Sequence, residues 1–86
     1  MVMLFYRVYK NKKKGIEEGN CLTVLRDPDS LILTGNYECY ETVFFDKNSE
    51  CCGSSVSPEY LRDKCKKISK EQAYKEHPNL QKYIEN

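Results

Sequence analysis

Residues 31–45 read LILTGNYECYETVFF, and this stretch decides the fold. Its two halves, 31–34 and 37–45, are rich in β-branched, aromatic and long apolar residues, which is typical of strands. Gly35-Asn36 between them is a two-residue link of the type that closes a tight hairpin. In the longer half, odd-numbered side chains face one way and even-numbered ones face the other. The stretch therefore predicts an antiparallel hairpin.

Three further strands are expected around this hairpin, at residues 1–9, 21–26 and 51–56. Both faces of the first are largely apolar, which predicts a strand covered on both sides. Residues 11–20 are expected to form a polar loop or loose edge, with Gly15 able to take a positive φ. Asp27-Pro28-Asp29-Ser30 is a strong turn signal, because Asp favours the first turn position and Pro the second.

The period changes from two to helical after residue 56. Ser57-Pro58 predicts a helix start, with Ser57 as the N-cap and proline in the first turn. Ser69 and Gln72 have the spacing of a capping box, and Pro78 predicts a helix boundary at His77. Helical apolar stripes precede and follow these positions, at Leu61, Cys65 and Ile68 and at Leu80, Tyr83 and Ile84.

The expected architecture is α+β. A five-strand antiparallel meander forms the sheet, and two or three short C-terminal helices pack on one face of it. The 86 residues suit a single domain over residues 1–86, and the chain contains no repeat, low-complexity tract or linker.

A cytoplasmic location is expected. No apolar run is long enough to span a membrane, and the basic residues follow the apolar start instead of preceding it as in a signal peptide. The five cysteines, an odd number, cannot all pair within the chain. We expect them to be free thiols that behave as small hydrophobic residues.

The net charge of +1 hides a segregation of charge along the chain. Residues 1–14 carry five basic groups and no acid, residues 15–59 carry nine acids and two basic groups, and residues 60–86 carry seven basic groups and four acids. Such a distribution favours a dipolar surface, which steers charged partners.

No enzymatic activity and no cofactor are expected. A zinc site would draw on Cys39, Cys51 or Cys52, Cys65 and His77, but paired ligands at zinc-finger spacing are missing. Cys65 and His77 lack a third orienting group for nucleophilic catalysis. The carboxylate pairs (Glu17-Glu18, Asp27 with Asp29, Glu38 with Glu41) and the candidate anion nest at Gly53-Ser54-Ser55 also have simpler interpretations, as solvated surface and as strand. A small cysteine-dependent or metal-binding protein is the second alternative.

The leading hypothesis is a small non-enzymatic protein-binding module. Seven tyrosines and three phenylalanines are many for one small core, and tyrosine favours interfaces. The protein would be an inhibitor or regulator, for example encoded by a phage or mobile element and directed at a host defence or nucleic-acid-processing protein. It would occupy a surface of a larger partner, one with a basic surface, through Tyr37, Glu38, Tyr40 and Glu41, with Glu17 and Glu18 as rim charges.

Single-stranded nucleic-acid binding is the first alternative. Tyr9 lies beside a basic loop that contains Lys10, Lys12, Lys13 and Lys14, and aromatic rings flanked by lysines stack bases and neutralise phosphates. A second basic cluster follows at Lys64, Lys66, Lys67 and Lys70. Against this alternative, the chain is nearly neutral, with few arginines. The sequence leaves a homodimer open.

Overall fold

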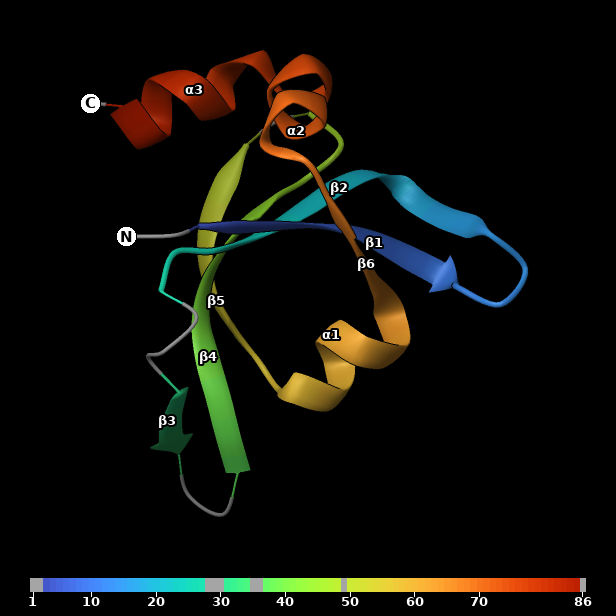
Figure 1. The fold of residues 1–86 in the computed structure, drawn as a ribbon, viewed down its shortest axis with the longest axis vertical. Coiled ribbons are helices and arrows are strands. Elements are labelled where there is room, and N and C mark those ends of the chain that lie inside the picture. The colour runs from blue at the N-terminus through green and yellow to red at the C-terminus, as the bar shows by residue number, and fades with distance from the viewer. Residues whose placement is uncertain (1–2, 28–30, 35–36, 49, 86) are drawn as a thin grey trace.

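The computed structural model describes residues 3–27, 31–34, 37–48 and 50–85. Its elements are β1 (Leu4–Asn11), β2 (Ile16–Leu25), β3 (Leu31–Thr34), β4 (Tyr37–Phe45), β5 (Cys51–Val56), α1 (Pro58–Lys64), β6 (Cys65–Ile68), α2 (Lys70–Glu76) and α3 (Pro78–Glu85) (Figure 1). The α+β prediction is confirmed, because five antiparallel strands precede three short C-terminal helices. No helix of the described residues is long and apolar enough to cross a bilayer.

The strand order is β3-β4-β2-β1-β6, and β5 pairs with β4 beside this row. In a simple meander β2 would pair with β3, the next strand along the chain. Here β2 pairs instead with the second half of β4, and β3 pairs with the first half. β4 spans nine residues, which is long enough to pair with both. β3 therefore continues the line of β2 along β4 (Figure 1). The predicted turn residues 28–30 and 35–36 lie outside the described residues.

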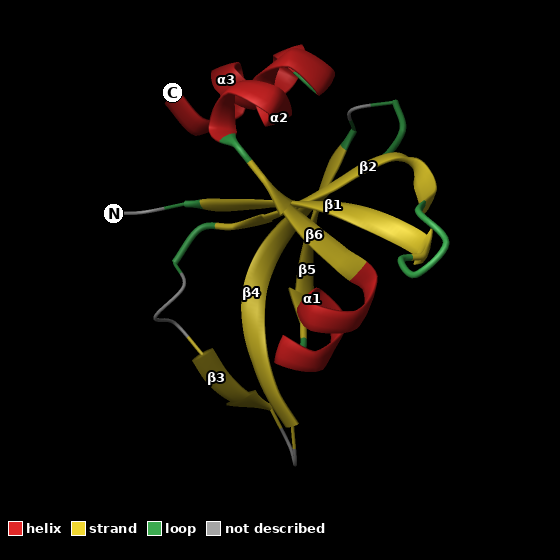
Figure 2. Cartoon of the chain, turned by 45° about the vertical axis from the view of Figure 1, so that its right-hand side comes forward, coloured by secondary structure: helices red, strands yellow, loops and turns green. Residues whose placement is uncertain are grey.

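The helices cover both faces of the sheet, which corrects the prediction that they pack on one face. α2 and α3 pack with one set of strand side chains, which includes Phe5, Val24 and Phe45. α1 packs on the opposite face, against Val8 and Leu25. The two groups of helices lie in separate parts of the molecule (Figure 2). The covering of both faces of β1, predicted from its sequence, is confirmed.

β6 explains why the helices divide between the faces. The stripe at Leu61, Cys65 and Ile68 predicts one continuous helix, but α1 ends at Lys64 and residues Cys65–Ile68 form a strand. This strand pairs with β1, from Val8 opposite Cys65 to Phe5 opposite Ile68. Hydrogen bonding to an otherwise unpaired sheet edge outweighs local helix propensity. The chain then continues to the other face.

The β1–β2 hairpin is longer than the sequence predicts. β2 begins at Ile16, in the segment expected to be a loop or loose edge, and Gly15 in the turn has the expected positive φ, 70°. The pairing of β1 with β2 shifts register between Arg7 and Tyr9. As a result Val8 and Tyr9 are both buried, although they are neighbours in the sequence.

The predicted helix starts are confirmed. The Ser57 hydroxyl accepts a hydrogen bond from the Tyr60 amide, and the Ser69 hydroxyl accepts one from the Gln72 amide, both at 3.1 Å. The Gln72 side chain differs from the capping-box prediction, because it donates to Glu76 Oε2 at 3.0 Å instead of reaching back to Ser69. α2 ends before His77, as Pro78 predicts.

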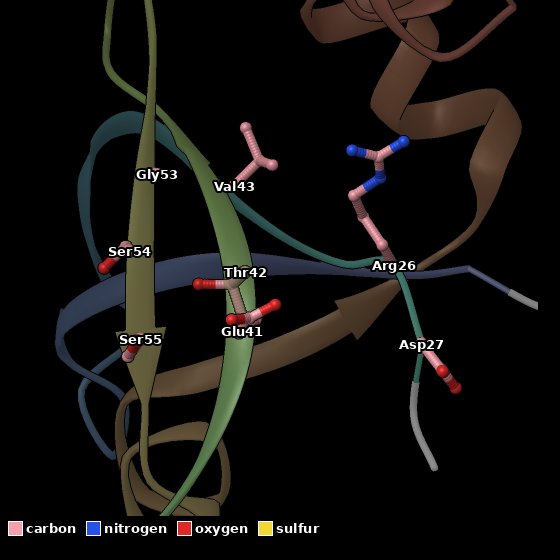
Figure 3. Close-up of a pocket in the computed structure, with 8 residues that line it drawn as sticks. All are labelled: Arg26, Asp27, Glu41, Thr42, Val43, Gly53, Ser54 and Ser55. Carbon is pink, nitrogen blue, oxygen red and sulfur yellow. The ribbon is translucent and has the colours of Figure 1, made fainter. Parts of the chain in front are cut away.

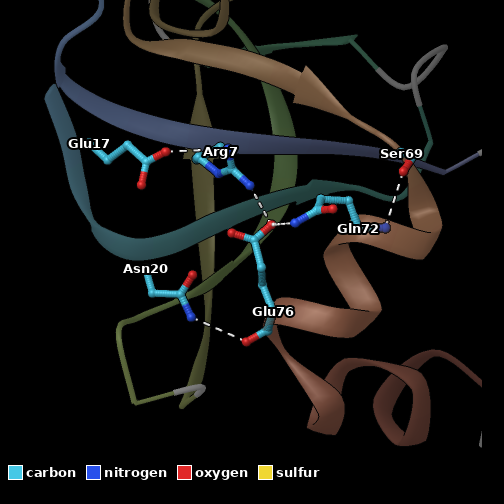
Figure 4. A network of polar contacts seen from close by, with 6 residues as sticks. All are labelled: Arg7, Glu17, Asn20, Ser69, Gln72 and Glu76. Carbon is cyan, nitrogen blue, oxygen red and sulfur yellow. Dashed lines mark hydrogen bonds and ion pairs between the residues drawn. The ribbon is translucent and has the colours of Figure 1, made fainter. Parts of the chain in front are cut away.

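A polar network ties α2 to β1 and β2 (Figure 4). The Arg7 guanidinium donates to Glu76 Oε2 and also forms an ion pair with Glu17 at 3.3 Å. Asn20 Nδ2 donates to the Glu76 backbone carbonyl at 3.2 Å. The Arg7 and Glu76 side chains are mostly shielded, at 20% and 22% exposure. Charged groups held this way fix the position of the helix on the sheet.

His77 makes the stability of the fold depend on pH. Burial lowers the pKa of His77 from its ordinary value and outweighs the opposing effects of Glu76, the Asn20 backbone and Asp46. The unfolded chain then binds the proton more readily than the folded one. The histidine contribution to stability is complete above about pH 6.5 and is lost as the pH falls below it.

We therefore expect the urea midpoint to fall between pH 7.5 and pH 5.5. In a His77→Gln variant, whose absolute stability is lower, the midpoint should change less over the same interval. A wild-type midpoint that is constant or rises on acidification would contradict the assignment to His77.

Candidate functional site

β5 presents a free strand edge. It pairs with β4 over its full length, and no other described strand pairs with it. Residues 51–55 are exposed, and Val56 is half-buried. One row of backbone groups on β5 therefore faces solvent.

The register identifies which groups these are. The Asp46 amide donates to the Glu50 carbonyl at 3.0 Å, and the pairing continues one-to-one from there to Val56. In an antiparallel pair, hydrogen-bonded and non-hydrogen-bonded positions alternate. Residues 52, 54 and 56 therefore bond to β4, and the N–H and C=O groups of Cys51, Gly53 and Ser55 point outward.

The β5 edge lacks the features that protect natural edge strands. Edges are normally kept short, or carry lysine, proline or a bulge, so that foreign strands do not add to them. β5 has six residues, CCGSSV, with no charge, no proline and a regular register. By contrast, the edge strand β6 has four residues, and its two central ones are Lys66 and Lys67. The β5 edge is thus open to an added strand and the β6 edge is protected.

Hollows flank β5 on both faces of the sheet. On the α2/α3 face a hollow of about 560 Å³ is lined by polar side chains, among them Arg26, Asp27, Glu41 and Ser55 (Figure 3). On the α1 face a hollow of about 520 Å³ is lined by Phe44, Val56 and Tyr60, with serine and threonine side chains. An added strand would project alternate side chains toward these two hollows.

The predicted partner-binding residues fall into two places. Tyr40 and Glu41 lie on β4 next to β5, opposite Val56 and Ser55, on the side of β5 away from its free edge. Tyr40 is half-buried, and Glu38 and Glu41 are exposed. For Tyr37 only the backbone is described, paired with Thr34, and its side chain lies outside the described part.

Glu17 and Glu18 are not brought to this place. Because Leu22 pairs with Phe45, these residues of β2 extend beyond the opposite end of β4 from Glu38. Glu17 is paired with Arg7, and Glu18 lines a small hollow at α1. The sequence suggested that these residues share one acidic region with Glu38 and Glu41, but the strand order places the two pairs apart.

The residues of the nucleic-acid alternative are exposed, with one exception. Lys10, Lys12, Lys13 and Lys14 are exposed around the β1–β2 turn. Tyr9 is only 8% exposed, so its ring cannot stack on a base. The register shift in β1 accounts for this burial.

The residues considered for metal binding and catalysis do not converge. Cys65 is buried under α1, and His77 is buried on the α2/α3 face. Within the described residues no three metal-binding side chains cluster. Burial raises the pKa of Cys65 to about 11, so its thiol stays protonated at neutral pH. Gly53-Ser54-Ser55 lies within β5 instead of forming an anion nest.

Neither a family model, nor a curated protein, nor a solved structure matches this chain. The function is therefore inferred from the geometry of the molecule itself.

Proposed function

We propose that this chain is a non-enzymatic protein-binding module that receives an extended segment of a partner at the β5 edge. The observation that carries the proposal is the six-residue, uncharged, exposed edge of β5. Strand addition of this kind derives affinity from backbone hydrogen bonds and specificity from the hollows that receive alternate side chains. The protein would act as an inhibitor or regulator by occupying that segment of its partner.

The two hollows indicate the chemistry of the partner segment. The hollow on the α2/α3 face is lined by the side chains of Arg26 and Glu41 together with Thr42 and Ser55, so it suits a polar or charged side chain. The hollow on the α1 face presents Phe44, Val56 and Tyr60, so it suits an apolar one. We therefore propose a segment in which apolar and polar residues alternate.

A cytoplasmic site of action is part of this proposal. All five cysteines are free, two of them exposed on β5. Exposed unpaired thiols are expected in a reducing compartment.

The test is affinity capture from a lysate of the source cells, with nuclease present, by wild-type protein and two variants. Ser55→Pro removes an outward N–H without touching the ladder to β4, and proline is tolerated at such edge positions. We expect recovery of the partner to fall about tenfold or more, because the partner carbonyl that faced this N–H is left without a donor in a packed interface.

Ser55→Ala is the matched control, because it keeps the N–H and removes only the hydroxyl. It should capture the partner like wild type, and circular dichroism should show both variants folded. Equal capture by Ser55→Pro and wild type, or no protein captured by wild type, would overturn the proposal. If Ser55→Pro does not fold, Ser55→Lys, which places a charge at the edge, takes its place.

A further inference from the structure

Three segments that are distant in the sequence bring cations to one region beside α1. Lys12 Nζ donates to the Arg62 backbone carbonyl at 2.7 Å, which joins the β1–β2 turn to the end of α1. Lys66 and Lys67 follow on β6, paired with Arg7 and Tyr6 of β1. We define the basic surface as the exposed residues of these segments: Lys10, Lys12, Lys13, Lys14, Arg62, Lys64, Lys66 and Lys67.

The charge of this surface is strongly unbalanced. Eight cations share the region with four carboxylates, those of Glu17, Glu18, Glu59 and Asp63. Glu17 is already paired with Arg7, at 3.3 Å, and Asp63 with Arg62, at 3.0 Å. The rest of the chain has six basic residues and nine acidic ones. The near-neutral whole therefore conceals a cationic side that would attract and orient a polyanion.

The basic surface also contains a hollow with aromatic walls. It has a volume of about 440 Å³, and the half-buried rings of Tyr6 and Tyr40 line it. Three of the cations surround the same hollow, namely Lys12, Arg62 and Lys67, whose partner Tyr6 on β1 shares its face of the sheet. Tyrosine rings among lysines offer stacking for a base and neutralisation for the flanking phosphates.

We infer that the basic surface binds single-stranded nucleic acid. A single strand can turn an unstacked base into the hollow between the two tyrosines, whereas a duplex keeps its bases stacked inside. This inference is independent of the proposed strand addition at β5, since it uses other residues and another ligand.

The first arm of the test is fluorescence anisotropy with a labelled mixed-sequence single strand, as DNA and as RNA, over a salt series. Affinity should fall as salt rises. In the Lys66→Gln/Lys67→Gln variant, the slope of log affinity against log salt should become shallower by about 0.7 for each phosphate that the protein no longer neutralises. The Lys13→Gln/Lys14→Gln variant should also make the salt dependence shallower. Because these residues lie outside β6, this result would show that the first effect does not come from a disturbed β6.

Lys75→Gln/Lys82→Gln is the matched control, with the same change of charge on α2 and α3. At about 0.1 M salt, where the Debye length is about 10 Å, it should bind within about twofold of wild type, because exposed charges on α2 and α3 are then largely screened from the basic surface. No binding at low salt, or an equal reduction in this control, would overturn the inference.

The second arm tests the aromatic hollow. An abasic oligonucleotide, which keeps the sugar-phosphate chain and lacks bases, should bind about tenfold more weakly than the normal strand. Tyr6→Leu should lose a similar factor for the normal strand and keep its affinity for the abasic one. Equal binding of the normal strand, the abasic strand and polyglutamate would overturn the inference and assign the surface to acidic proteins.

Discussion

Replacement of Phe45 by alanine should lower the free energy of unfolding by about 3–5 kcal/mol. Phe45 is 2% exposed and lies in the cluster between the sheet and helices α2 and α3. Its ring meets His77 at 6.1 Å and Tyr83 edge-on at 5.8 Å. The alanine variant loses the transfer free energy of the ring. It also leaves a cavity that the sheet, α2 and α3 would have to close by moving together.

This decrease is large for a chain of this size. Domains are stable by only about 5–15 kcal/mol, and small ones lie near the lower end. Urea unfolding followed by circular dichroism should show the Phe45→Ala transition moved close to zero denaturant. If the alanine variant is unfolded, Phe45→Leu takes its place. It keeps most of the side-chain volume and should give a complete transition from which the decrease in the free energy of unfolding can be measured.

Ile16→Ala is the control for Phe45. Ile16 is 49% exposed in β2, so its truncation should change stability by less than about 0.5 kcal/mol. A Phe45→Ala cost no greater than that of Ile16→Ala would mean that this core is not organised around Phe45.

The parts of the fold that follow from local pattern were predictable. The alternation in residues 37–45 predicts β4 and its two faces, and the structure places Val43 and Phe45 in one cluster and Tyr40 and Phe44 in the other. The helix starts at Ser57 and Ser69 follow from hydrogen bonds within four residues. Such features depend on neighbours in the sequence, which is why the sequence reveals them.

The parts that depend on tertiary pairing were not predictable in this way. Cys65 and Ile68 are spaced to suit a helix face, and nothing local shows that β1 has an edge for them to join. The same holds for Tyr9, whose burial depends on a register shift in the β1–β2 pair.

The candidate sites show the same division. The lysines around residue 12 and those around residue 66 are visible in the sequence as two clusters, but only the fold joins them beside α1. β5 was predicted as a strand, and its role as an open edge follows from the strand order alone. The available signal in the sequence was the absence of charge from CCGSSV. This absence acquires a meaning only once the strand is known to lie at an edge.

The second large effect is expected at Arg7. Replacing Arg7 with methionine should lower the free energy of unfolding by about 2 kcal/mol, the range for hydrogen bonds to charged groups. The substitution keeps much of the apolar stem and removes the guanidinium that holds Glu76 and Glu17. Glu76 would then be a shielded carboxylate whose remaining side-chain partner is Gln72. The cost arises mostly from that uncompensated charge and not from the removal of the ion pair itself.

A double-mutant cycle separates these two contributions. In Arg7→Met/Glu76→Gln no charge is left at the centre of the network, so the double variant should be more stable than the sum of the single effects predicts. Arg62→Met is the matched control, because the Arg62–Asp63 pair joins adjacent residues that are 71% and 60% exposed. It should leave the free energy of unfolding close to that of wild type, since exposed ion pairs contribute little. If Arg7→Met and Arg62→Met cost the same, the network does not fix α2 on the sheet, and the apolar packing of Ala73 and Tyr74 must hold the helix without it.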